Sequence, residues 1–167
     1  MVLCSGEVSH PAPGGKFQEG VCRFDKKRIL VPTDFSKCSR YALEWALCFA
    51  RSFGCAVVLL DVEDRRTLAS ASQFEEVQEE VMREIDEEFD AFAADLPVEG
   101  IPVERVIGSA LGDPTDEILR RARETDLIVI PSPRGIGLSQ TLLERIAEKV
   151  IQNAPCPVLC TSCPPGE

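Results

Sequence analysis

Residues 125–159, TDLIVIPSPRGIGLSQTLLERIAEKVIQNAPCPVL, decide the fold of this chain. The apolar run LIVIP at 127–131 predicts a buried strand, and a second apolar run, PVLCT, follows at 157–161. Between them a glycine loop opens into a segment whose leucine, isoleucine and valine residues recur at helical spacing. A strand, a helix and another strand in this order predict a parallel unit with a right-handed crossover. Glycine loops at such a helix start are common phosphate-binding sites.

The same alternation of strand and helix runs upstream, with a clear stop at Gly54 for the first helix and a clear start at Asp113 and Pro114 for the third. Ser36 is the expected N-cap of the first helix. The strands are apolar on both faces, which suits a covered parallel sheet. We therefore predict one α/β domain: a doubly wound, five-stranded parallel sheet with two helices on each face. The other predicted strands are 28–32, 55–62 and 101–108.

Apolar residues at helical spacing indicate which face of two of the predicted helices packs on the sheet. The second predicted helix carries an apolar stripe from Phe74 to Leu96, and its glutamate-rich opposite face is expected to be solvated, with a docking surface for a basic partner as the alternative. The first helix is expected to pack through Ala42, Trp45, Ala46, Phe49, Ala50 and Phe53.

Composition limits the domain organisation and the classes of function. Residues 1–26 are rich in glycine and proline without periodicity and predict a flexible N-terminal tail, residues 27–161 one domain, and 162–167 a C-terminal tail. The formal net charge of -10 argues against nucleic-acid binding through the backbone. No apolar run reaches the roughly 18 residues of a membrane span, and no secretory signal is apparent. A cytoplasmic protein is the expectation.

Histidine and cysteine offer little for catalysis. The one histidine, His10, lies in the tail, so no Ser-His-Asp or Cys-His arrangement is expected in the domain, and we predict no catalytic and no metal-binding residue. The pair Cys160 and Cys163 has the spacing of redox and zinc sites, but at the end of a strand it is expected to be incidental. Zinc bound together with Cys4 and Cys22 is the alternative. Replacing both members of the pair by serine is expected to leave thermal stability nearly unchanged.

The other cysteines bear on the redox state of the chain. The sequence has eight cysteines, and with no export signal we do not expect disulfides. Cys38, Cys48 and Cys55 lie in or beside apolar segments and are expected to be small buried hydrophobes.

Three stretches resemble the universal stress protein family: ILVPTDFSKCSRYALEWA, VIGSALGDPTDEIL and the stretch 125–159 quoted above. The resemblance covers about residues 27–161. It implies the strand order 3-2-1-4-5, homodimers often built through the last strand, and a regulatory or binding role in stress responses rather than a settled enzymatic activity. Some members of the family bind ATP and others do not. The homodimer expected here would use the fifth strand, PVLCT.

The open-sheet rule and the resemblance point to one cleft. Ligands bind beyond the carboxyl ends of strands where the strand order reverses, here between the loops 32–36 and 131–137. By resemblance, Asp34 and Val62 lie where the family contacts ribose and base. Asp34 as a cap of the first helix, Val62 as plain core, and the loop glycines as positions that need positive φ remain open alternatives. The candidate nucleotide-binding residues are Pro32, Thr33, Asp34, Val62, Ser132, Gly135, Gly137 and Arg145.

The phosphate loop departs from the family pattern, which is glycine, two residues, glycine, nine residues, glycine and then serine or threonine. Aligned on the last helix, Ser132 stands at the first glycine, Gly135 at the second, and Glu144-Arg145 at the closing pair, with a spacer of eight residues.

These changes weaken a phosphate site. Pro131 and Pro133 lack N–H donors, and Glu144 would repel phosphate. We therefore expect a non-enzymatic module with no cofactor, or at most ATP or AMP bound weakly with magnesium. The alternatives are a nucleotide-binding protein that uses Ser132 and Arg145 in a variant loop, and a slow ATP hydrolase or thiol redox protein.

Overall fold

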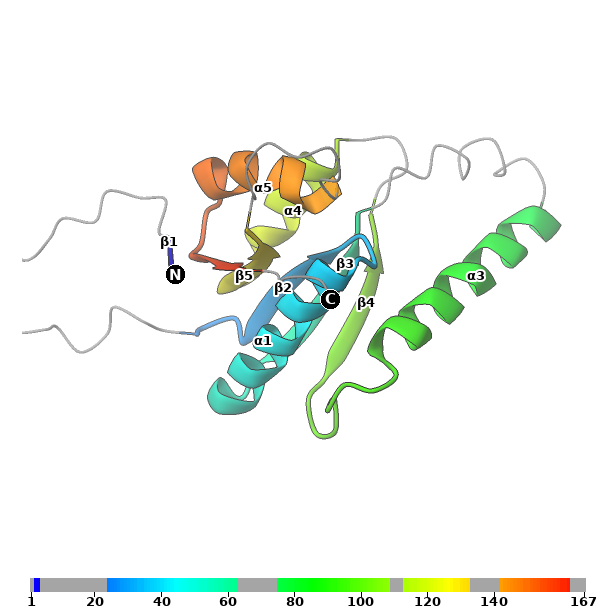
Figure 1. Cartoon of the computed structure of the whole chain (residues 1–167), viewed down its shortest axis with the longest axis horizontal. Helices are drawn as coiled ribbons and strands as arrows, with labels where there is room; N and C mark the ends of the chain where they lie inside the picture. The colour runs from blue at the N-terminus through cyan, green and yellow to red at the C-terminus, as the bar shows by residue number, and fades with distance from the viewer. Residues whose placement is uncertain (1, 4–23, 63–74, 109–112, 133–141, 163–167) are drawn as a thin grey trace, which may run out of the picture.

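The structure is a computed structural model, and it describes residues 2–3, 24–62, 75–108, 113–132 and 142–162 (Figure 1). Among these residues no helix is both long enough and apolar enough to cross a membrane. The elements along the chain are β1 (Val2–Leu3), β2 (Arg28–Thr33), α1 (Lys37–Phe53), β3 (Ala56–Asp61), α3 (Glu75–Ala93), β4 (Val103–Ile107), α4 (Pro114–Ala122), β5 (Leu127–Pro131), α5 (Leu142–Asn153) and β6 (Val158–Thr161).

The sheet has the order β1-β6-β5-β2-β3-β4. The strands from β2 to β6 are all parallel, so the predicted five-stranded sheet in the order 3-2-1-4-5 is confirmed. One addition was not predicted: β1 lies antiparallel on the edge of β6, with Val2 opposite Leu159 and Leu3 opposite Val158. Two residues are too few to show the alternation that reveals a strand in a sequence.

Two helices cover each face of the sheet, as predicted. On one face α1 and α3 bury Leu43, Leu47, Ile85 and Phe89 against the strands. On the other face α4 and α5 bury a second cluster that includes Ile118, Leu143 and Val150. Figure 1 shows α1 on one side of the strands and the pair α4 and α5 on the other. Burial on both sides explains why β5 is apolar at every position.

The predicted packing face of α1 was wrong for Trp45 and Phe53, whereas Phe49 is partly buried against the core as predicted. Trp45 is 44% exposed and Phe53 is 46% exposed, whereas the neighbouring leucines Leu43 and Leu47 are buried. Three buried alanines, at positions 42, 46 and 50, form the centre of the stripe and let the helix lie close to the sheet. Trp45 and Phe53 lie at the border of that contact, where they stay exposed.

The expected helix ends are present. Ser36 is the N-cap of α1 and accepts a hydrogen bond from the Ser39 N–H, and Gly54 ends the helix in the left-handed conformation at φ 63°. Asp113 caps α4 and accepts from the Thr115 N–H at 2.8 Å. This bond is the main reason why the pKa of Asp113 lies below its usual value. On α3 the described glutamates at positions 80, 84, 87 and 88 are exposed, as expected of a solvated face.

Candidate functional site

The site lies at the carboxyl edge of the sheet, where the parallel strands end and the strand order reverses. Strands β2 and β5 are neighbours there, with Leu30 in register with Ile128. The chain leaves β2 toward α1 on one face and leaves β5 toward α5 on the other. Asp34 and Ser132 therefore begin the two loops that flank the crevice. The candidate residues Gly135 and Gly137 lie outside the described residues, as does the side chain of Arg145.

The turn after β2 is held by its own hydroxyl groups. Thr33 is fully buried, and its Oγ1 accepts from the Phe35 N–H at 3.0 Å. The same oxygen lies 3.2 Å from the hydroxyl of Ser39 in the first turn of α1. Pro32, one residue earlier, is buried within β2. Neither Pro32 nor Thr33 therefore presents a free polar side-chain atom to the crevice.

Phe35 fixes the direction of this turn. Its φ of 55° lies in the left-handed region, which costs a bulky residue on the order of 1–3 kcal/mol. Its ring packs edge-on against Phe89 and Phe92 of α3, at centroid distances of 5.1 and 5.4 Å. The aromatic contacts offset the backbone strain and hold the turn, with the adjacent Asp34, against the core.

Asp34 bridges the starts of two helices. Its Oδ1 accepts from the Ser36 N–H at 3.2 Å, just before α1. Its Oδ2 lies 3.4 Å from the Leu143 N–H in the first turn of α5, as a long hydrogen bond. A helix N-terminus is the position at which an anionic ligand is favoured. In this structure the carboxylate of Asp34 takes that position at the start of α5. Asp34 therefore has the capping role considered from the sequence, but it bonds near the starts of both α1 and α5.

At the end of β5, the backbone N–H of Ser132 is also bonded within the sheet. The Ser132 N–H donates to the Thr161 carbonyl oxygen at 2.8 Å, which extends the pairing of β5 with β6 by one residue. Pro131, just before it, has no N–H. Pro131 and Ser132, the described residues at this end of β5, thus offer no unpaired N–H.

The end of β3 lies beside the end of β2, on the side away from β5. Val62 is 3% exposed and packs in the cluster under α4 and α5, which favours the core role considered for it. Asp61, one residue earlier, is 2% exposed. The Gly108 N–H donates to the Asp61 carbonyl oxygen at 2.9 Å. A Cβ at position 108 would come within 2.6 Å of that oxygen, so this close approach requires glycine.

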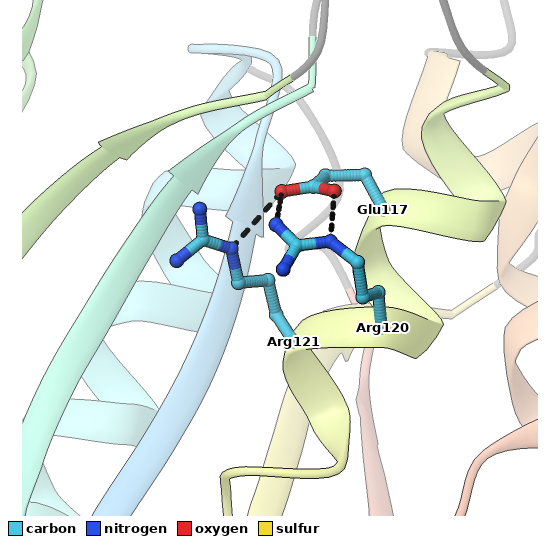
Figure 2. A network of polar contacts seen from close by, with 3 residues as sticks. All are labelled: Glu117, Arg120 and Arg121. Atoms are coloured by element: carbon cyan, nitrogen blue, oxygen red, sulfur yellow. Dashed lines mark hydrogen bonds and ion pairs between the residues drawn. The ribbon is translucent and has the colours of Figure 1, made fainter.

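A charged network on α4 lies beside Gly108 (Figure 2). The Glu117 carboxylate accepts from Arg120 at 2.6 and 2.7 Å and from the Nε of Arg121 at 3.0 Å. The hydrogen bond from Arg120 is the main reason why the pKa of Glu117 lies below its usual value. Both guanidinium groups thus already have a carboxylate partner. Sequence reasoning missed this network, although the spacing of three and four residues on a helix was a usable signal.

An open pocket of about 370 Å³ lies next to the crevice, between α1 and β6. The buried Oγ1 of Thr161 has no hydrogen-bond partner there among the described residues. The sequence did not indicate this pocket, because Trp45 was assigned to the core. Within the described part of the chain, no group of three or more histidine, cysteine, aspartate or glutamate residues could hold a metal ion. The pocket is lined by Tyr41, Trp45, Phe49, Ser132, Leu159, Cys160, Thr161 and Ser162.

The fold and this crevice define a doubly wound α/β protein of the kind that places ligands at a strand-order reversal. The chain belongs to the universal stress protein family, whose model matches residues 26–162. This finding confirms the resemblance seen in the sequence.

Individual relatives agree with the family assignment. The chain is 31% identical over 146 residues to universal stress protein MJ0531 of Methanocaldococcus jannaschii, covering 84% of this chain and 85% of the relative. The solved structure of protein MJ0577 from the same organism aligns with a TM-score of 0.64 at 30% identity, covering 84% of this chain and 99% of that one. A universal stress protein of Archaeoglobus fulgidus shares the fold, with a TM-score of 0.59, 23% identity, and coverage of 80% and 96%.

Proposed function

We propose that this universal stress protein is a non-enzymatic regulatory or binding module in which the family's adenine nucleotide site has lost most of its affinity. The observation that carries the proposal is the position of Asp34. Its carboxylate lies at the start of α5, where a bound phosphate would otherwise be favoured. A ligand phosphate would have to displace this carboxylate or bind beside it against charge repulsion.

The backbone donors near the crevice support the same conclusion. Phosphate loops act through N–H groups that point at the ligand. The Ser132 N–H is bonded to the Thr161 carbonyl, and the Leu143 N–H faces Asp34. Two described N–H groups beside the crevice are therefore already bonded within the chain, and Pro133 supplies none.

The sequence of the loop adds a third argument. With a spacer of eight residues before Glu144, the two glycine positions fall on Ser132 and Gly135, and with the usual nine they fall on Pro131 and Arg134. At most one of these glycines is present in either register. Glu144 brings a negative charge to the closing pair, where the family pattern has glycine. At about 4 Å each pair of unit charges repels by roughly 1 to 4 kcal/mol between water and near-surface dielectric.

Nucleotide carried through purification tests this proposal. The purified protein is denatured, and the released small molecules are separated by chromatography and followed by their absorbance near the adenine maximum. We expect far less than one adenine nucleotide per chain. A stoichiometric amount of ATP or AMP would show that the loop is a working variant.

We further propose that two copies associate through β6 and the adjoining surface of α1. The edge of β6 is paired by β1 at only Val158 and Leu159, and an apolar edge strand favours further covering. Trp45 is 44% exposed and lines the pocket beside that edge, which adds an aromatic anchor of the kind enriched in interfaces.

The test of this association uses surface residues, because Val158 is fully buried and a charge there would disrupt the fold itself. A Trp45→Glu variant should shift a micromolar solution from dimer toward monomer in light scattering. Phe53→Glu is the matched control, because Phe53 is 46% exposed on the same helix and does not line the pocket. A monomeric parent protein, or equal effects of the two variants, would contradict this assembly.

A further inference from the structure

The two exposed aromatic side chains of α1, Trp45 and Phe53, have different surroundings. The ring of Phe53 is stacked with two others, at centroid distances of 4.7 Å to Phe24 and 6.0 Å to Phe49. Trp45 meets the ring of Tyr41 at 6.4 Å and an angle of 87°, and it has no stacked ring among the described residues. Trp45 also lines the pocket between α1 and β6, whereas Phe53 does not. Trp45 is therefore the exposed ring that a bound molecule can cover.

Trp45 belongs to an aromatic wall of this pocket. Tyr41, Trp45 and Phe49 follow one another at intervals of four residues on α1, so their side chains lie along one side of the helix. All three line the pocket. Aromatic rings attract one another in offset-stacked and edge-to-face arrangements. This wall therefore favours a ligand with a planar ring.

The rest of the described lining comes from the ends of β5 and β6 and supplies hydroxyl groups. Ser132, Thr161 and Ser162 all belong to it. The hydrogen bond from the Ser132 N–H to the Thr161 carbonyl oxygen, at 2.8 Å, holds the two strand ends together. A hydroxyl group can both donate and accept, so these residues suit a hydroxyl or carbonyl group on a ligand.

The thiol of Cys160 also lines the pocket and adds no charge to it. It is free, and burial raises the pKa of this thiol, so it is neutral at pH 7. The other cysteines of this face correct two expectations from the sequence: Cys38 is disulfide-bonded and Cys48 is exposed, whereas Cys55 is buried as expected.

The described lining contains no aspartate, glutamate, lysine, arginine or histidine. A phosphate or carboxylate ligand would therefore find no cationic partner among these residues, and an ammonium ligand would find no carboxylate. A charged ligand would lose its hydration without a paired charge in return. The chemistry of the described walls selects an uncharged ligand.

The size of the pocket limits the ligand further. Its volume of about 370 Å³ lies at the lower end of the range of about 300–1,000 Å³ that small-molecule sites cover. We propose that the pocket binds an uncharged, planar aromatic compound of one or two fused rings that carries a hydroxyl or carbonyl group. Its ring lies against Trp45, and its polar group bonds to the hydroxyl groups at the ends of β5 and β6. Ser132 is the one described residue that this pocket shares with the candidate nucleotide-binding residues, so the inference does not rest on nucleotide affinity.

The sequence offers a selective reporter for this test. It has one tryptophan, Trp45, and one tyrosine, Tyr41, and both line the pocket. The full chain is produced with 5-fluorotryptophan, so its fluorine NMR spectrum reports on Trp45 alone, and it is titrated with coumarin, an uncharged two-ring compound with a carbonyl group. We expect a saturable shift with a dissociation constant below about 0.5 mM, an affinity within reach of so small a ligand.

A charged analogue is the control for the ligand. Coumarin-3-carboxylate has the same two rings and a negative charge, and it should bind at least tenfold more weakly than coumarin. A Trp45 signal that coumarin does not move would overturn the proposal. Equal affinities for the two compounds would also overturn it, because the site would then not select an uncharged ligand.

Variants of α1 test whether the ring of Trp45 holds the probe. The single tyrosine, labelled as 3-fluorotyrosine, follows coumarin binding in every variant. Trp45→Ala should weaken binding at least tenfold, and Trp45→Phe, which keeps a ring, should retain most of the affinity. Phe53→Ala is the matched control, because Phe53 is exposed to the same degree on the same helix outside the pocket. Equal affinities of Trp45→Ala and Phe53→Ala would contradict the assignment.

The test also separates this inference from the proposed association of two copies. If a second copy covers Trp45, coumarin and that copy compete, so the apparent dissociation constant rises with protein concentration while the titration still saturates. That result supports both proposals. A Trp45 signal that coumarin leaves unmoved even at the lowest protein concentration overturns the ligand site and leaves the association standing.

Discussion

The carboxyl ends of β2 and β5 lie side by side in the sheet, yet they are built differently. The end of β2 is a polar turn in which Thr33 and Asp34 bond to the first residues of α1 and, through Asp34, to α5. The end of β5 is a proline followed by Ser132, whose N–H extends the sheet to Thr161. Both ends of the crevice thus use their polar groups to hold the fold together. The two ends differ in how they do this: the end of β2 bonds to helices, and the end of β5 bonds to a neighbouring strand. In both, the crevice keeps its place at the strand-order reversal while its polar groups stabilise the fold.

The largest effect is expected at the turn after β2. Replacing Phe35 by alanine removes the ring that packs on Phe89 and Phe92 and should lower the free energy of unfolding by about 2 to 3 kcal/mol. Phe35→Gly loses the same ring but relieves the positive φ, so it should be no less stable than the alanine variant. Urea unfolding of both variants measures the contribution of the ring contacts and the cost of the positive φ. A glycine variant that is clearly less stable than the alanine variant would show that the turn is not strained.

A smaller effect is expected from repairing the loop after β5. Replacing Glu144-Arg145 by Gly-Ser removes a repelling carboxylate and restores a hydroxyl donor, and Pro133→Arg restores a backbone N–H. The triple variant should bind ATP at least tenfold more tightly than the parent, a gain of about 1.4 kcal/mol or more. Calorimetric titration measures both proteins. An unchanged or weaker affinity would show that the loop sequence is not what limits binding.

The smallest effect is expected at the Glu117 network, which tests whether the charges beside the crevice are structural. Glu117→Gln weakens the bonds to Arg120 and Arg121 and should cost about 0.5 to 1 kcal/mol at pH 7, since Arg120 is largely exposed. The pKa of Glu117 is lowered in the folded protein, so its contribution is present above the usual value of 4.5 and is lost as the pH falls below it. The parent and the variant should therefore converge in stability in acid. Glu84→Gln, at an exposed position of α3, is the control and should show no such convergence.

Much of the fold could be predicted because its signals are local. The strands are apolar on both faces, and the caps at Ser36 and Asp113 have short-range sequence signatures. The exposure of Trp45 could not be predicted, because helical spacing shows a stripe but not where its border falls. The position of the crevice followed from the strand order. The contact of Asp34 with Leu143, 109 residues away, has no local signature, and it is this contact that changes the interpretation of the site.

The central claim is that the polar groups of the crevice serve the fold and leave little affinity for nucleotide. The most direct measurement is a calorimetric titration of the parent protein with ATP, with and without magnesium. The account predicts a dissociation constant weaker than about 100 μM under both conditions, which corresponds to roughly −5.5 kcal/mol. Binding at low micromolar concentration, abolished by Arg145→Ala, would contradict it and would show that Arg145 replaces the missing glycine and serine of the loop.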